Sequence, residues 1–178
     1  TDIIERYSID ECFLDYTGSV SLFGDPVKVA YKIKDDIYSK FGFTVNVGVG
    51  NNKLLAKMAS DFEKPNKVHT LFSNEVESKM WGLPVSDLFM IGRASSKKLM
   101  DMGIKTIGEL AVVPLEELTK RFKSMGKMMH EYANGIDNSP VYYEREAAKS
   151  ISSSTVLAYN YRDEHKIKEV IRQLSMDV

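Results

Sequence analysis

The chain has 178 residues, a net charge of −1, one cysteine and three histidines. This length is enough to bury a core, as one large domain or two small ones. The single Cys12 excludes an internal disulfide and a thiolate zinc site, and the histidines lack metal-ligand spacing. Because no apolar run approaches the roughly 20 residues of a membrane span and the N-terminus lacks a signal-peptide pattern, we expect no membrane attachment and a cytoplasmic location.

Residues 5–16 predict a β-hairpin with two carboxylates at its tip. One strand covers residues 5–9 and the other 12–16, the chain reverses at Asp10 and Glu11, and residues 17–19 end the pair. Adjacent side chains on a regular strand point to opposite faces, so these carboxylates can share one cation only at a turn, a bulge or a strand end. Hard oxygen ligands without nearby His or Cys favour Mg²⁺ or Mn²⁺. Solvated charge at an exposed turn is the alternative, and the pair alone leaves both open.

A helix, a strand and a second helix follow the hairpin. Asp25 and Pro26 are typical of a helix start, and apolar residues recur at helical spacing as far as residue 41. Residues 43–49 alternate between apolar and polar, which predicts a strand, and Asn51 or Asn52 then caps a helix that ends before residue 64. This order indicates an α+β fold with helices on one face of a mainly antiparallel sheet.

Three lysines, Lys53, Lys57 and Lys64, recur along the second helix or just beyond it. Each is more typical of surface charge than of a ligand, and Lys64, fixed by Pro65, is the best placed to reach a polyphosphate. The preceding Gly-Val-Gly turn fails as a phosphate loop, because Lys53 stands where a dinucleotide fingerprint has its third glycine and no Gly-Lys-Ser/Thr follows.

The chain after residue 72 is expected to be helical, with helices at 73–81, 86–90 and 95–102 and a glycine turn at Gly103. The piece from Phe89 to Leu110 resembles a helix-hairpin-helix, in which backbone N–H groups bind a DNA phosphate, although Met90 replaces the usual first glycine. Eight basic and four acidic residues lie between positions 93 and 127, a surplus that supports only modest phosphate binding. A plain helical bundle is the alternative reading.

Three ordered motifs together resemble the Y-family translesion DNA polymerases, the UmuC/DinB or ImpB/MucB/SamB group, and most closely its UmuC-like branch. Residues 8–15 look like the palm carboxylate motif of that family, and residues 48–66 are similar to its second palm signature. Residues 149–155 look like the start of its little-finger domain. The resemblance covers nearly the whole chain.

The resemblance implies an α+β partial palm in residues 1–72, a small all-α thumb with a helix-hairpin-helix-like motif in 73–146, and the beginning of a little-finger domain in 147–178. It implies nucleotidyl transfer in damage bypass and an SOS-type response, with Asp10 and Glu11 as catalytic and metal-binding carboxylates, two Mg²⁺ ions in the intact enzyme, and Lys64 near the triphosphate. The implied DNA-binding residues are Ile91, Gly92, Arg93, Lys97 and Lys98. Primer-template DNA and a deoxynucleoside triphosphate are the implied partners, with a sliding clamp or a recombinase as further ones, in the bacterial cytosol.

The chain begins close to the palm carboxylates, whereas the family's other catalytic Asp, its fingers and most of its little finger lie outside the matched region. We therefore expect a truncated fragment with an incomplete two-metal site and no polymerase activity by itself. Residues 159–178 carry an apolar helix face, expected to be loosely packed or paired with a neighbouring molecule: Ile167, Val170, Ile171 and Leu174. A non-catalytic DNA-binding module and a palm-fold nucleotide cyclase are the rival functions.

Overall fold

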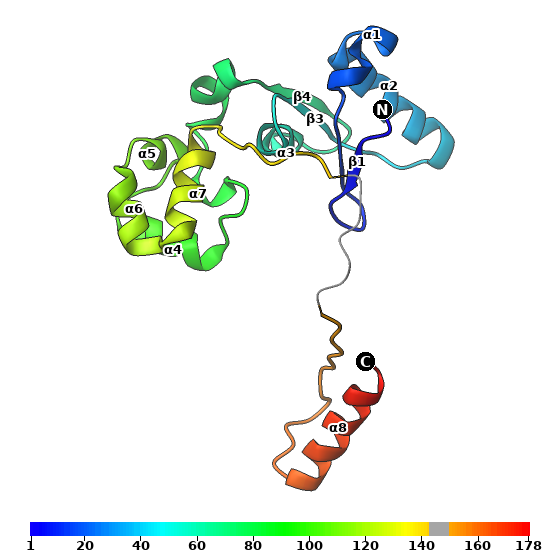
Figure 1. The fold of residues 1–178 in the computed structure, drawn as a ribbon, viewed down its shortest axis with the longest axis vertical. Helices are drawn as coiled ribbons and strands as arrows, with labels where there is room; N and C mark the ends of the chain where they lie inside the picture. Colours follow the sequence, from blue (N-terminus) through cyan, green and yellow to red (C-terminus); the bar gives the residue numbers. More distant parts are fainter. Residues whose placement is uncertain (143–149) are drawn as a thin grey trace. The chain divides into compact units, whose positions relative to one another are not determined.

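A computed structural model describes residues 1–142 and 150–178, and the chain divides into two compact units, residues 1–143 and 144–178 (Figure 1). The expected start of the little finger at residue 147 and the first residue of its motif, Lys149, lie outside the described residues. Within the part that is described, no helix is both long enough and apolar enough to span a membrane.

The first unit contains all the strands of the described chain, and helices fill most of its second half (Figure 1). The strands are β1 (Ile4–Arg6), β2 (Cys12–Leu14), β3 (Val47–Gly50) and β4 (Val68–Leu71). The helices are α1 (Val20–Phe23), α2 (Pro26–Phe41), α3 (Lys53–Asp61), α4 (Arg93–Asp101), α5 (Ile107–Ala111), α6 (Leu115–Phe122) and α7 (Ser124–Ala133).

The strands β1 and β2 form the predicted antiparallel hairpin, with Glu5 opposite Phe13. Both strands are shorter than expected: β2 ends at Leu14, and β1 ends at Arg6 because the N–H groups of Tyr7 and Ser8 donate to the Glu11 carbonyl oxygen, at 3.0 and 3.2 Å, and close the turn there. The turn therefore spans residues 7–11, and a 3₁₀ turn at Thr17–Ser19 follows the hairpin.

The second sheet pairs β3 with β4 in parallel, with Val47 opposite Val68. This parallel pair differs from the mainly antiparallel sheet that the sequence predicted. The two strands can run parallel because α3 forms the crossover between them. The expected strand at 43–49 starts only at Val47. The side chain of Asn46 instead donates to the Ser60 and Glu63 carbonyl oxygens, at 3.2 and 3.3 Å, and accepts from the Lys67 N–H at 3.0 Å, so side-chain contacts hold the chain here in place of strand pairing.

The two predicted helices of this half are confirmed, together with their caps. Asp25 accepts a hydrogen bond from the Lys28 N–H at 2.9 Å, and α2 ends at Gly42, whose φ of 73° is the left-handed conformation that glycine adopts most easily. Asn52, rather than Asn51, caps α3 by accepting from the Leu55 N–H at 2.8 Å.

The helical half departs from the expected pattern at its start. A 3₁₀ turn, Ser73–Glu75, runs into one π-helical turn, Val76–Met80, where an α-helix at 73–81 was expected. The helix expected at 86–90 is wrong: only Val85–Asp87 form a 3₁₀ turn, and Met90 then takes a left-handed φ of 69° that no helix continues through. The next helix, α4, begins two residues earlier than predicted.

One hydrophobic core joins the sheet half of the first unit to the helical half. Leu54, Leu55 and Met58 of α3 and Leu71 of β4 belong to the same buried cluster as residues of the later helices, among them Leu99, Ile107, Leu110, Leu118 and Met129. The indole N–H of Trp81 also donates to the Ala133 carbonyl oxygen at 3.0 Å. The α+β class is confirmed, and α3 lies where the two halves meet.

The second unit consists, in its described residues 150–178, of a segment without regular structure followed by α8 (Glu164–Met176). Asp163 caps this helix by accepting from the His165 N–H at 2.9 Å. None of the residues described in this unit is buried, so the apolar face that the sequence predicts has no covering there. Loose packing or pairing with a neighbour stays a prediction.

Candidate active site and nucleic-acid interface

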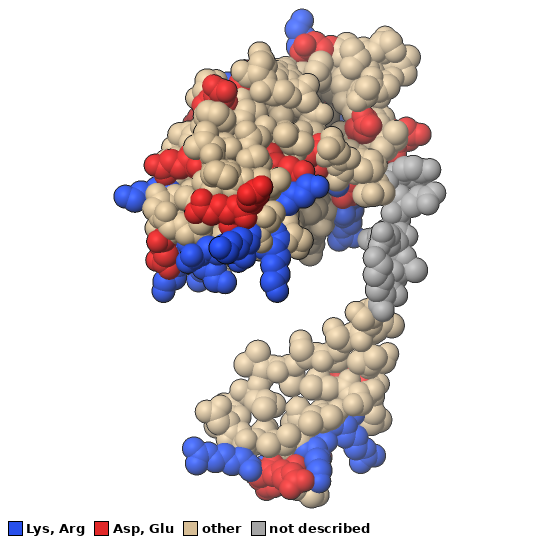
Figure 2. All heavy atoms as spheres, turned by 60° about the vertical axis from the view of Figure 1, so that its left-hand side comes forward, with Lys and Arg blue, Asp and Glu red and all other residues tan. Residues whose placement is uncertain are grey.

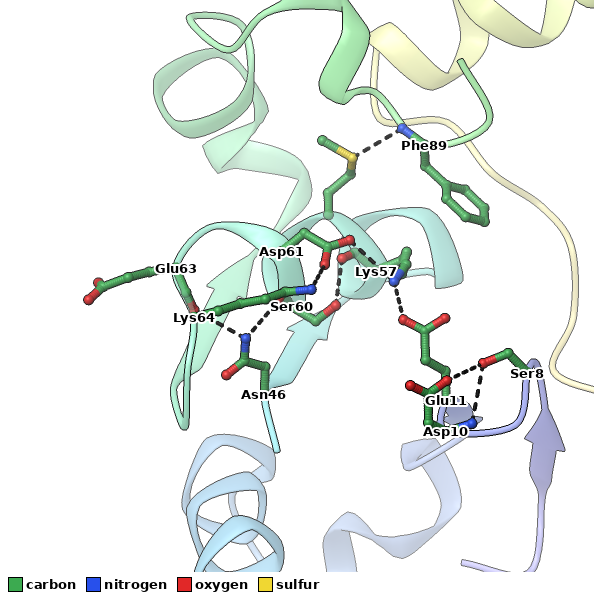
Figure 3. A network of polar contacts seen from close by, with 11 residues as sticks. Ser8, Asp10, Glu11, Asn46, Lys57, Ser60, Asp61, Glu63, Lys64 and Phe89 are labelled. Atoms are coloured by element: carbon green, nitrogen blue, oxygen red, sulfur yellow. Dashed lines mark hydrogen bonds and ion pairs between the residues drawn. The ribbon is translucent and has the colours of Figure 1, made fainter. Parts of the chain in front are cut away.

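The hairpin turn brings Asp10 and Glu11 to the side of α3 (Figure 3). Asp10 accepts a hydrogen bond from the Ser8 hydroxyl at 2.8 Å, which fixes its carboxylate within the turn. The Glu11 side chain extends toward α3 and forms an ion pair with Lys57. The turn thus presents two neighbouring carboxylates, only one of which is paired with a cation in the part of the chain that is described.

Lys57 belongs to a network of ion pairs that runs from Glu11 through Lys57 and Asp61 to Lys64 (Figure 3). Its ammonium lies 3.2 Å from Asp61 Oδ2, and the Lys64 ammonium lies 2.7 Å from Asp61 Oδ1. The side chain of Lys57 is only 15% exposed, which corrects its interpretation as surface charge, whereas that of Lys64 is 60% exposed. Asp61 therefore connects the lysine at the carboxylate turn with the lysine predicted to meet a triphosphate.

The pKa values of this network follow from the same contacts. Burial raises the pKa of the Asp61 carboxyl, but hydrogen bonds from Lys64 and Lys57, with their positive charges, outweigh burial and hold it below its ordinary value. Burial lowers the pKa of the Lys57 ammonium, and the hydrogen bonds to Glu11 and Asp61 outweigh it in the opposite direction. Both groups therefore keep their charges at neutral pH.

Lys53 forms a second ion pair one helical turn earlier. Its ammonium lies 2.8 and 2.7 Å from the two carboxylate oxygens of Glu5 in β1, and both side chains are nearly buried, at 16% and 17% exposure. This too corrects its interpretation as surface charge. Sequence reasoning did not single out Glu5, although the i, i+4 spacing of Lys53 and Lys57 is a signal that both lie on one face of α3, toward a common partner.

The carboxylate oxygens at the turn are of the type that a hard divalent cation binds, but the turn supplies too few of them for a complete site. Mg²⁺ takes oxygen ligands and keeps several of its waters, so Asp10 and Glu11 are suitable ligands. In residues 1–142 and 150–178, however, no group of three or more His, Cys, Asp or Glu side chains is placed to hold a metal. These two carboxylates would therefore be part of a metal site.

The turn before α4, residues 90–92, and the first two turns of α4 carry the side chains predicted to bind DNA. Ile91 is buried and anchors the turn, whereas Arg93, Lys97 and Lys98 are exposed. Gly92 caps α4, and among the described residues no side chain accepts from the first N–H groups of that helix. Met90 adopts a left-handed φ of 69° where the motif usually has glycine, so the turn keeps the glycine conformation without the glycine.

The helical half of the first unit carries basic side chains around this turn. Figure 2 shows Lys and Arg side chains gathered along the lower edge of the first unit, with acidic side chains beside them. A pocket of about 290 Å³ opens next to the turn and is lined by Ile91, Arg93 and Lys97 together with Ser86, Ser96 and Met100. A basic rim over an apolar floor suits the backbone of a nucleic acid rather than base edges.

Comparison with known proteins identifies the family. The impB/mucB/samB family model matches residues 1–61, and the model of the DNA polymerase-iota thumb domain matches residues 86–137. A solved Y-family DNA polymerase chimera of Dbh has a TM-score of 0.81 and 31% identity, over 98% of this chain and 51% of that chain. The chain belongs to the Y-family of DNA polymerases.

Relatives within the Y-family carry the name DNA polymerase IV. That of Clostridium acetobutylicum is 48% identical over 171 residues, and DNA polymerase IV 2 of Bacillus subtilis is 42% identical over 183 residues. DinB from Sulfolobus solfataricus has a TM-score of 0.70 and 29% identity, over 98% of this chain and 52% of that chain. These matches do not confirm the UmuC-like branch.

The chain spans less than half the length of these curated relatives. The match with the Clostridium protein takes in 96% of this chain and 43% of that protein. The match with the Bacillus protein takes in all of this chain and 44% of that protein. The segment matched by the impB/mucB/samB model contains Asp10 and Glu11, and that matched by the thumb model contains all five predicted DNA-binding residues. Lys64 lies just beyond the first of these segments.

Proposed function

We propose that the chain is part of a DNA-directed DNA polymerase that extends primers past damaged template bases. The observation that carries the proposal is the hairpin turn, where Glu11 pairs with Lys57 of α3 and Asp10 is its neighbour, in a chain 48% identical to a relative named DNA polymerase IV. The proposed domains are a palm in residues 1–72, a thumb in 73–146 and the beginning of a little finger in 147–178. The cytosol, an SOS-type response, and a sliding clamp or recombinase partner rest on the family resemblance alone.

In this proposal Asp10 and Glu11 hold Mg²⁺ together with at least one further ligand. When bound, two such ions activate the primer 3′-hydroxyl and neutralise the leaving pyrophosphate. Lys57 balances the charge of Glu11 in the ion-free protein, since unpaired carboxylates close together repel each other. Lys64 is the exposed end of the charge network and is the side chain that meets the triphosphate.

In this proposal the turn before α4, residues 90–92, and the start of that helix bind the sugar-phosphate backbone of the DNA duplex. Arg93, Lys97 and Lys98 neutralise phosphates, and the N–H groups at the start of α4, after Gly92, donate to a phosphate oxygen. Such contacts carry no sequence information, which suits an enzyme that must accept primer-template DNA of any sequence and with damaged bases. Binding of this kind weakens steeply as salt rises.

The experiment that tests this function replaces the matching segment of the Clostridium DNA polymerase IV with this chain and measures primer extension with Mg²⁺. We expect activity in the chimera, its loss by at least about a hundredfold in Asp10→Ala or Glu11→Ala, and unchanged affinity for primer-template DNA. Glu77→Ala, which removes an exposed acid in another part of the chain, is the matched control.

Two outcomes would count against the proposal. Extension by Asp10→Ala and Glu11→Ala at the rate of Glu77→Ala would remove the metal role of the turn. A chimera that binds DNA but never extends a primer would favour the non-catalytic DNA-binding module instead. The 178-residue chain alone is expected to show no extension, which the same assay measures directly.

A further inference from the structure

The N-terminus of α3 binds the segment that leaves the helical half of the first unit, residues 135–142. Three consecutive residues make the contacts. The Asn52 side chain donates to the Gly135 carbonyl oxygen at 2.9 Å, and the Leu54 N–H donates to Asp137 Oδ2 at 3.2 Å. Between them, the Lys53 ammonium donates to the Pro140 carbonyl oxygen at 3.3 Å. The exit segment is therefore held along its length by one helix end.

Glu5 extends this attachment to the hairpin. Its carboxylate accepts from the Lys53 ammonium at both oxygens and from the Tyr142 N–H at 2.8 Å. Glu5 lies in β1 and Tyr142 lies 137 residues later, so a single carboxylate joins the first strand to the end of the exit segment. Lys53 lies between them and contacts both.

Aromatic rings enclose the Lys53 ammonium. It lies 5.2 Å from the ring centre of Phe13 and 5.7 Å from that of Tyr142, both within the range of a cation–π contact. Phe13 is the β2 residue opposite Glu5, so Lys53 contacts both strands of the hairpin. The ammonium thus has partners in the hairpin and in the exit segment.

We propose that Lys53 is a positioning residue that ties the carboxylate hairpin and the exit segment to the same end of α3. Asp10 and Glu11 are carried on that hairpin, and the exit segment leads along the chain to the second unit. A displacement of either one then pulls on the other through Lys53. The link itself stands on these contacts alone, and its consequence for metal binding rests on the proposed function.

The burial of this pair separates it from ordinary surface ion pairs. An exposed pair contributes little to stability, and Lys67–Glu63, with side chains 46% and 60% exposed, is such a pair in the same unit. Removal of one partner from a nearly buried, hydrogen-bonded pair leaves the other charge without compensation. Lys53→Met should therefore loosen both attached segments, whereas Lys67→Met should loosen nothing.

Amide hydrogen exchange of the 178-residue chain tests the link. The reporters are the Tyr142 N–H, bound to Glu5, and the Asp15 N–H, which donates to the Ile3 carbonyl oxygen at 3.0 Å across the hairpin. In Lys53→Met we expect both to exchange on the order of tenfold faster than in Lys67→Met. Lys53→Arg, which keeps the charge, should restore most of the protection.

Glu5→Gln decides the case if Lys53→Met unfolds the chain, because it keeps the size of the side chain and removes only its charge. Faster exchange at Tyr142 in Glu5→Gln, with unchanged protection of the Trp81 indole N–H bound to Ala133, supports a local link. Exchange at Tyr142 and Asp15 within twofold of Lys67→Met in both variants would overturn the proposal. Because no catalysis is measured, a failed primer-extension assay leaves this result unaffected.

Discussion

Gly48 sets the distance between β3 and α3, and its replacement by alanine should be strongly destabilising. A Cβ atom at this position would lie 1.8 Å from the Ala56 carbonyl oxygen and 2.6 Å from the Ser60 backbone nitrogen. Both are backbone atoms of α3, so no side-chain rotation can relieve the clash. Since real Cβ contacts essentially never fall below 3.0 Å, the helix must move by more than 1 Å relative to the strand.

The cost follows from what that movement would disturb. Leu54, Leu55 and Met58 of α3 are in the core, and overpacking a well-filled core costs about 1–3 kcal/mol even where side chains can yield. Alanine recovers about 0.4–1 kcal/mol by restricting the unfolded chain. Because backbone atoms must move here, we expect Gly48→Ala to lower the free energy of unfolding by about 3 kcal/mol.

Urea denaturation followed by circular dichroism measures this change, with Gly18→Ala as the matched control. Apart from its own chain neighbours and helical turn, no heavy atom of the described residues lies within 4 Å of a Cβ at Gly18, so its replacement should change the free energy of unfolding by less than about 0.5 kcal/mol. Equal stability of the two variants would refute the reasoning that close approach of α3 requires glycine. The same shift would also carry Lys53 and Lys57 away from Glu5 and Glu11.

Two further predictions concern Glu5 and Thr106. Burial raises the pKa of Glu5, but the Lys53 and Tyr142 hydrogen bonds and the Lys53 charge outweigh it, so the pKa lies below its ordinary value of 4.5. The stability that this carboxylate contributes is present above pH 4.5 and is lost as pH falls through the lowered pKa. In Glu5→Gln the free energy of unfolding should therefore fall less steeply below pH 4.5 than in the unchanged chain. Thr106 accepts from the Glu109 N–H at 3.1 Å at the start of α5, and Thr106→Ala should cost about 1 kcal/mol in the same denaturation assay, whereas an unchanged midpoint would contradict a role for this cap.

The sequence alone predicted the features that depend on near neighbours in the chain. The hairpin turn at Asp10 and Glu11, the cap at Asp25 and a cap at Asn51 or Asn52 all follow from residues within a few positions of one another. Turns and helix caps depend on interactions between residues close in sequence, so short sequence patterns predict them. The resemblance of the ordered motifs then sufficed for the family, which the comparisons confirm.

Only the tertiary structure decided which charges meet. Lys53 and Lys57 carry the ordinary pattern of a solvated helix face, yet they pair with Glu5 and Glu11, 48 and 46 residues away. The parallel pairing of β3 with β4 and the core shared by both halves of the first unit were likewise not readable from periodicity. The physical reason is that a lysine has the same local sequence signature in water as in a nearly buried ion pair, and its partner is chosen by packing between distant segments.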